Sequence, residues 1–302
     1  MDKLSLCLGL VAIVIVCAAG GYYALSGSEG GSDTPYNSGS EHTQNNDSTE
    51  KIGSPAITGK CGKNLSWSIK DDVLTISGTG EMTHFSYIPN SNMGTTAPWY
   101  QYRDSYSSVK VESGITSIGM LAFHGCGIKS VDLPDTLTYI GMDAFTHELT
   151  MNKLVLPDSL KVVEKDAFSY SGIKSIVTGS SLETLKERAF RACDSLVAIT
   201  FTDAIRSIGT DCFSSCRNLK TVIIPDDSLE YIGPGAFASC KSLSEFTVNK
   251  GLKTIGENAF YQCLNLKTVY NHSDLPIEAG QKKINGVVPY GYIGYYASEI
   301  LA

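Results

Sequence analysis

Apolar residues return at nearly constant intervals along most of this chain. A phenylalanine preceded by Ala or Cys recurs every 22 to 24 residues. These residues are Phe123, Phe145, Phe168, Phe190, Phe213, Phe237 and Phe260. The surrounding sequence repeats with them: the unit from Ser117 reads SIGMLAFHGCGIKSVDLPDTLT and that from Ser207 reads SIGTDCFSSCRNLKTVIIPDDSLE. Seven units of this length predict stacked structural repeats and not one closed globular core.

The pattern within one unit predicts a short strand. Val131 and Leu133 alternate with Ser130 and Asp132, as in a strand with one buried face. A proline follows in several units (Pro134, Pro157 and Pro225) and should end the strand because proline has no backbone N–H. One coil cannot bury its own apolar side, whereas stacked coils form a continuous parallel sheet over a shared core. Each fully buried Leu, Ile, Val or Phe then contributes about 1.5–3 kcal/mol.

The N-terminus predicts export. Leu4 to Leu25 contains no charged residue over 22 positions, long enough for a transmembrane helix. Lys3 precedes it and the next cation is Lys51, so the positive-inside rule places the N-terminus in the cytoplasm and the rest outside. The alternative is a cleaved signal peptide with small residues at Ala18-Ala19-Gly20, giving a secreted protein. Residues 26–55 contain few apolar side chains that could form a core, so we predict that they form a disordered extracellular linker.

A short segment before the repeats predicts a hairpin. Leu65 to Ile69 and Val73 to Ile76 alternate in hydrophobicity across an Asp71-Asp72 turn. Together with the frame I-G-x-x-A-F-x-x-C-x-x-L-x-x-V-x-L-P and the ending VVPYGYIGYYASEI, this segment resembles the BspA-like leucine-rich-repeat surface proteins. The resemblance covers about residues 58–300 and implies a leucine-rich-repeat fold at the cell surface, where several members of the family act as adhesins.

The fold class predicted is therefore a β-rich leucine-rich-repeat solenoid of about seven repeats, with an N-terminal β-hairpin cap and one preceding transmembrane or signal helix. The predicted division of the chain follows from these features. It comprises a membrane anchor or signal segment (1–25), a linker (26–55), an N-terminal β cap (56–106), the solenoid (107–275) and a C-terminal cap (276–302).

Neither the charge nor the motifs indicate nucleic-acid binding or catalysis. The net charge is −7 with a pI of about 5.3, and no run of Lys or Arg is present to neutralise phosphates. The sequence lacks G-x-S-x-G, H-E-x-x-H and a phosphate loop, so we expect no enzyme and no cofactor. One repeat position is occupied by residues that we interpret as turn formers: Asp143, Asp166, Asp211 and Asn258. A paired-carboxylate site is the alternative interpretation of these residues. His124, at a position of varied residue type, is predicted to lie in a solvated turn.

Five cysteines lie three residues after a repeat phenylalanine. They are Cys126, Cys193, Cys216, Cys240 and Cys263. We interpret them as small, half-buried thiols at a turn. Disulfides between adjacent coils are the alternative, because export permits them. A zinc site at Cys212 and Cys216 is disfavoured since Cys212 should point into the core, and Cys61 has no obvious partner.

The outward strand positions are the predicted binding surface. One outward column, after Lys110, consists of Asp132, Val155, Val177, Thr200, Ile223, Thr247 and Tyr270. Its neighbour consists of Ser108, Ser130, Lys153, Ser175, Ala198, Thr221, Glu245 and Thr268. Exposed apolar residues in a row are typical of an interface, although β-branched residues also simply suit strands.

The function predicted is binding or adhesion at the cell surface, with a protein or glycan of another cell or matrix as partner. The alternative is a structural surface coat that self-associates, and a carbohydrate-active enzyme is a third possibility. Three N-x-S/T acceptors are glycosylation candidates: Asn46, Asn64 and Asn271.

Overall fold

The computed structural model describes residues 56–91, 94–277, 293, 297 and 299–301. All of them lie in one compact unit, residues 52–302. The predicted membrane or signal segment (1–25) and the linker (26–55), with Asn46, lie outside the described residues. Within the described part of the chain, no helix is long and apolar enough to cross a membrane.

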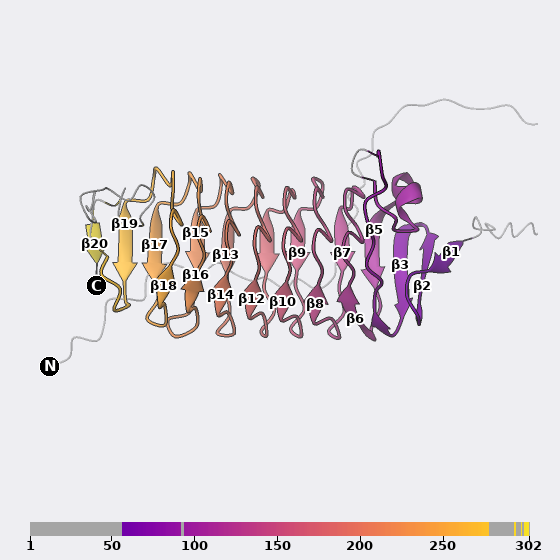
Figure 1. Cartoon of the computed structure of the whole chain (residues 1–302), viewed down its shortest axis with the longest axis horizontal. Helices are drawn as coiled ribbons and strands as arrows, with labels where there is room; N and C mark the ends of the chain where they lie inside the picture. Colours follow the sequence, from indigo (N-terminus) through magenta and orange to yellow (C-terminus); the bar gives the residue numbers. More distant parts are fainter. Residues whose placement is uncertain (1–55, 92–93, 278–292, 294–296, 298, 302) are drawn as a thin grey trace, which may run out of the picture. The chain divides into compact units, whose positions relative to one another are not determined.

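An antiparallel hairpin precedes the repeats. It joins β2 (Leu65–Lys70) to β3 (Asp72–Gly78) across Asp71 and Asp72, which have the left-handed backbone that such a tight turn needs. β1 (Ile57–Lys60) pairs with the outer edge of β2. On its other side β3 pairs in parallel with β5 (Tyr106–Val111), so the hairpin extends the sheet of the repeats (Figure 1).

The repeats form a β-solenoid of about seven turns with one three-to-four-residue strand per coil (Figure 1). These strands are β7 (Ser130–Asp132), β9 (Lys153–Val155), β11 (Ser175–Val177), β13 (Ala198–Thr200), β15 (Thr221–Ile223), β17 (Glu245–Val248) and β19 (Thr268–Asn271). Their pairing is parallel, β7 lies beside β9 and β15 beside β17, and β20 (Glu299–Leu301) follows β19. β7, β9 and β15 each end two residues before a proline, which confirms the strand predicted within each unit.

A second parallel sheet lines another side of the solenoid, and the sequence pattern did not predict it. Its strands are β4 (Gly80–Glu81), β6 (Ile115–Ile118), β8 (Tyr139–Ile140), β10 (Val162–Val163), β12 (Thr184–Leu185), β14 (Ser207–Ile208), β16 (Tyr231–Ile232) and β18 (Thr254–Ile255). Most contain two residues, too few to show an alternation. The described part of the chain has one 3₁₀ helix, η1 (Tyr100–Ser105), and no α-helix.

The repeat phenylalanines form one buried row between the sheets, as the spacing predicts. All seven are fully buried, and rings of successive coils stack with centroids 5.0 to 5.5 Å apart. Trp99 extends the row at its N-terminal end, 5.4 Å from Phe123. Its indole N–H donates a hydrogen bond of 2.7 Å to the carbonyl of Ala122. The row fixes the stacking of the coils and hence the register of the side chains that face outward.

Candidate binding face

The outward positions of the longer strands form one surface, which we call the strand face. It comprises these positions on β5, β7, β9, β11, β13, β15, β17 and β19, with the residue before each strand. Strand pairing sets Val155 beside Val177, Thr200 beside Ile223, and Thr247 beside Tyr270. The predicted residues thus follow one another in a row: Asp132, Val155, Val177, Thr200 and Ile223 are exposed, while Thr247 and Tyr270 are half-buried.

Three apolar residues of this row are substantially exposed. Val155 retains 46% of its accessible surface, Val177 49% and Ile223 45%. Val197, at the start of β13, adds a fourth exposed apolar side chain. Their inward neighbours Leu154, Ile176 and Ile199 are buried. The exposed residues are therefore not needed for the core, and they leave an apolar stripe on the surface.

Lysines line the edge of the strand face where the strands begin, a feature that sequence reasoning missed. Each rung contributes one residue to this edge: Ser107 within β5 and, directly before the strands that follow, Lys129, Asn152, Lys174, Val197, Lys220, Ser244 and Lys267. Backbone hydrogen bonds link neighbouring rungs, among them Lys129 to Ser107 at 2.8 Å and Lys220 to Val197 at 2.8 Å. We call this column the lysine edge. Its signal is visible in the sequence only after the repeats are aligned on their strands, since the lysines are far apart along the chain.

The opposite edge of the strand face is acidic. Asp135, Asp158, Asp203 and Asp226 follow the ends of β7, β9, β13 and β15, and all are exposed. Some cations elsewhere in the described chain are held in ion pairs. Arg217 pairs with Asp194 at 3.0 Å and Lys253 with Glu230 at 2.8 Å. Among the described residues, Lys110, Lys129, Lys153, Lys174 and Lys220 have no carboxylate within ion-pair distance.

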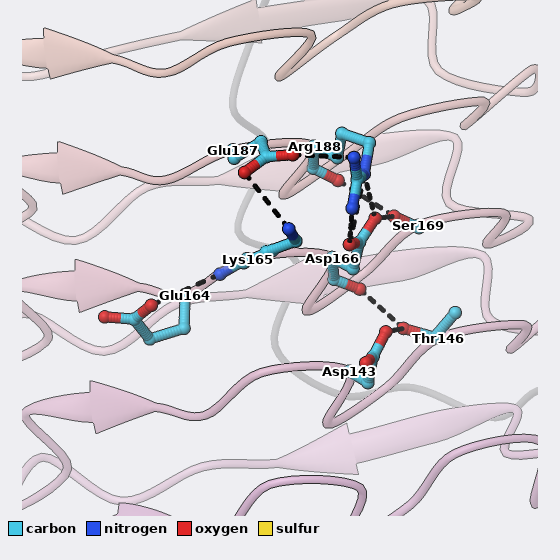
Figure 2. A network of polar contacts seen from close by, with 8 residues as sticks. All are labelled: Asp143, Thr146, Glu164, Lys165, Asp166, Ser169, Glu187 and Arg188. Carbon is cyan, nitrogen blue, oxygen red and sulfur yellow. Dashed lines mark hydrogen bonds and ion pairs between the residues drawn. The ribbon is translucent and has the colours of Figure 1, made fainter.

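The repeated aspartates occupy a separate turn, and Figure 2 shows two of them, Asp143 and Asp166. Asp143, Asp166, Asp211 and Asn258 all have a left-handed backbone (φ 52 to 56°), as turn formers do. Arg188 shares this position and binds Asp166 through two nitrogens, with Nη2 2.8 Å from Oδ2. Ser169 donates a further hydrogen bond of 2.8 Å to Asp166. The turn is therefore held by side-chain contacts between coils as well as by local backbone geometry.

These contacts also bear on the alternative of a paired-carboxylate site. Burial alone would raise the pKa of Asp166, but hydrogen bonds from Arg188 and Ser169 outweigh it and hold that pKa below its usual value. Burial and the neighbouring Asp166 raise the pKa of Asp143, whose Oδ1 accepts a hydrogen bond from Thr146 at 3.3 Å. Each of these carboxylates thus has a structural partner. In the part of the chain that the structure describes, no group of three or more His, Cys, Asp and Glu could hold a metal ion.

His124 contradicts the prediction of a solvated turn, because it is only 2% exposed. Tyr87 packs edge-on against it from the segment before the repeats, at 5.4 Å between ring centroids. His147 packs against it from the next coil at 5.6 Å. Burial, together with the charge that His147 can carry, lowers the pKa of His124 to about 4. The imidazole is therefore neutral at physiological pH and acts as a packing residue.

The repeat cysteines are more deeply buried than predicted, and those of the described residues are free thiols. The alternative of disulfides between coils is thus wrong in this structure. Each thiol of Cys193, Cys216, Cys240 and Cys263 donates a hydrogen bond of 3.1 to 3.3 Å to a phenylalanine carbonyl of the preceding coil. Ser171 makes the same contact to the carbonyl of Phe145 with its hydroxyl. From the third coil to the seventh, this column therefore supplies one inward hydrogen-bond donor per coil.

Two glycosylation candidates lie in the described residues. Asn64 is exposed at the turn before β2. Asn271 is half-buried, and its Nδ2 donates a hydrogen bond of 2.9 Å to the carbonyl of Leu275. Its Oδ1 accepts hydrogen bonds from Ser273, the third residue of the same motif. Asn64 is hence the more accessible of the two acceptors.

Solved structures with a similar arrangement come from bacterial proteins. A leucine-rich-repeat protein of Eubacterium ventriosum is 25% identical, with 73% of each chain covered and a TM-score of 0.45. A leucine-rich-repeat protein of Bacteroides ovatus is 20% identical over 70% of this chain (TM-score 0.47), and a leucine-rich cell surface protein of Faecalibacterium prausnitzii is 22% identical over 73% (TM-score 0.45). The alignment spans 56% of the length of each of the latter two. No curated protein matches the sequence.

One protein family matches the repeats directly. The profile of the BspA-type leucine-rich-repeat region matches six copies, over residues 97–178 and 161–278. These ranges overlap and together span more than half of the chain. The chain therefore belongs to the family of proteins with BspA-type leucine-rich repeats.

Proposed function

We propose that this protein is a cell-surface recognition protein that binds a protein or glycan through the strand face. The observation that supports this proposal most strongly is the row of Val155, Val177 and Ile223, whose side chains are each about half exposed on a regular sheet. A solvated sheet face is ordinarily polar, so exposed apolar residues in register favour a contact surface. The strands hold the row in place without a loop, and little ordering entropy would be lost on binding.

The proposal includes display outside the cell. It is supported by the apolar segment from Leu4 to Leu25 and by the polar residues 26–55, which separate that segment from the solenoid. A solenoid on such a spacer would be held away from the membrane, with its strand face available to a partner.

Binding to an array of glycans and matrix proteins tests this function. The full-length protein, kept in mild detergent, is compared with Val177→Asp and Ile223→Asp, which place charges in the middle of the apolar stripe. Tyr231→Asp is the control, because Tyr231 is an exposed outward residue of β16 in the other sheet. We expect the two strand-face variants to lose array binding and the control to keep it. Equal binding by all three folded variants would contradict the proposal.

A self-associating surface coat is the second candidate function, and the same apolar stripe supports it. In that case copies of the chain would cover each other's strand faces. Light scattering of the full-length protein at increasing concentration separates the two functions. For a coat protein, the measured particle mass would increase with concentration, and Val177→Asp would prevent this increase. For a recognition protein, the mass would stay constant.

A further inference from the structure

The lysine edge has a regular interval along the solenoid. Lys129, Lys174 and Lys220 belong to the first, third and fifth coils, and Asn152 and Val197 occupy the coils between them. Adjacent strands lie about 4.8 Å apart, so lysines in every second coil are about 10 Å apart. That interval is close to the length of one disaccharide in an extended polysaccharide.

This region of the strand face has a charge opposite to that of the whole chain. The net charge of the protein is −7. Over the first five coils and β5, however, the outward strand positions and the lysine edge carry Lys110, Lys129, Lys153, Lys174 and Lys220. Among the described residues at these positions, Asp132 is the one acidic residue, because the aspartates of the acidic edge lie beyond the strand ends. Since these lysines have no carboxylate within ion-pair distance in the described chain, their charge is available to a ligand.

Groups suited to the uncharged parts of a sugar lie beside the lysines. Ser175, Thr200 and Thr221 expose hydroxyls that make no hydrogen bond to another described residue. Val155 and Val177 provide a flat apolar strip against which the C–H face of a pyranose ring can pack. The three kinds of group run parallel to the stacking axis, so a ligand in contact with all of them would also lie along that axis.

We propose that the strand face binds a linear acidic polysaccharide. Successive disaccharides would each place an anionic group beside the lysine edge, in register with Lys129, Lys174 and Lys220. This inference rests on the recognition function proposed above and names the ligand class of the same face. Single-stranded nucleic acid is disfavoured because its binding sites use aromatic rings on which bases stack, and the strand face has none over the first five coils. An acidic polypeptide would match the two-coil interval only with an acidic residue at about every third position of an extended chain.

The test uses the full-length protein in mild detergent and a chondroitin sulfate decasaccharide as the probe. The triple variant K129Q/K174Q/K220Q removes the lysine edge, and K63Q/K161Q/K186Q removes three exposed lysines elsewhere with the same change in net charge. We expect the edge variant to bind about tenfold more weakly, because three exposed charge contacts are lost. Its affinity should also depend less steeply on salt. The control variant should bind like the unaltered protein.

Three results would overturn the ligand class. Equal weakening of both triple variants would show that net charge, and not the lysine edge, drives binding. Tighter binding of single-stranded DNA or poly-L-glutamate than of chondroitin sulfate, lost in the edge variant, would assign the face to another polyanion. Desulfated, carboxyl-reduced chondroitin of the same length should not bind, and equal binding of this neutral polymer would likewise contradict the inference.

The two proposals fail in different ways. If Val177→Asp abolishes binding to an array ligand while K129Q/K174Q/K220Q leaves all binding unchanged, the strand face is a recognition surface but not for an acidic polysaccharide. If neither variant changes any binding, the recognition function fails as well.

Discussion

Glu148 shows how a single residue adapts one coil to a shortened turn. Five of the seven coils have cysteine at its position. The first coil, like the third, has one residue between this position and the next buried residue, here Ile128, whereas the other five coils have two. The buried Glu148 side chain of the next coil accepts hydrogen bonds from the backbone N–H groups of Cys126, at 2.8 Å, and Ile128. Burial raises the pKa of Glu148 to about 8, although these hydrogen bonds favour the ionised form.

Replacing Glu148 should therefore destabilise the first two coils. Glu148→Ala leaves the buried N–H of Ile128 without an acceptor, and leaves the N–H of Cys126 with only the carbonyl of Phe123 at 3.3 Å. We therefore expect the free energy of unfolding to fall by about 1–3 kcal/mol. Glu148→Gln keeps one acceptor oxygen and should lose less. Urea unfolding at one fixed pH measures both variants, and an alanine variant as stable as the unaltered protein would refute this role.

His124 predicts a pH dependence of stability. The pKa of His124 is about 4 in the folded protein, against about 6.5 in an unfolded chain. Between these values the unfolded chain binds a proton that the folded chain does not, so stability falls as the pH decreases from about 6.5 to about 4. His124→Phe keeps a packed ring and removes this contribution, which reaches about 1.4 kcal/mol per pH unit. Thermal unfolding at pH 7, 6 and 5 should show a shallower loss in the variant; the same loss in both proteins would contradict the assignment.

At the scale of the element, the sequence predicts some strands and not others. The alternation of Val131 and Leu133 predicts β7 (Ser130–Asp132), which contains Val131, while Leu133 follows the end of the strand and packs against the core. The two-residue strands such as β8 (Tyr139–Ile140) are too short to alternate, and their ladder exists only because the coils stack. His124 was misassigned for a similar reason: the packing of Tyr87 against it comes from a segment outside the repeat.

The cysteine column gives a prediction for a single coil. The Cys240 thiol donates to the carbonyl of Phe213 at 3.2 Å, and Ser171 makes the equivalent bond with a hydroxyl. Cys240→Ser should keep the hydrogen bond and cost less than Cys240→Ala, which leaves the buried carbonyl without this donor and opens a small cavity. We expect a difference of about 1 kcal/mol in chemical unfolding. A serine variant less stable than the alanine variant would show that the column serves packing alone.

Across the whole molecule, the phenylalanine row transmits the stacking from coil to coil. Phe190 lies in the middle, with rings of Phe168 and Phe213 at 5.2 and 5.5 Å. Phe190→Ala should lower stability by about 3–5 kcal/mol, and Phe190→Leu by less. Because each repeat contacts only its neighbours, the alanine variant should also unfold in two steps, one for each half. A single unshifted transition would show that the row is not the core of the solenoid.

The candidate site was predictable only in part, because it is a property of the assembled stack. The apolar members Val155, Val177 and Ile223 follow from strand alternation, and the structure places them in one row. The lysines of the lysine edge lie about two repeats apart in sequence. They therefore form no basic run that would indicate the edge in the sequence. A net charge of −7 cannot reveal a local excess of cations that appears only when the coils are stacked.

Recognition through the strand face is the central claim, and hydrogen–deuterium exchange tests it most directly. Peptides of the full-length protein are compared with and without a saturating array ligand. We predict slower exchange in β9, β11, β13 and β15, whose outward residues form the apolar stripe and the lysine edge, and no change in β8, β10, β12 and β14 of the other sheet. Protection confined to that other sheet, or to the turns, would contradict the account.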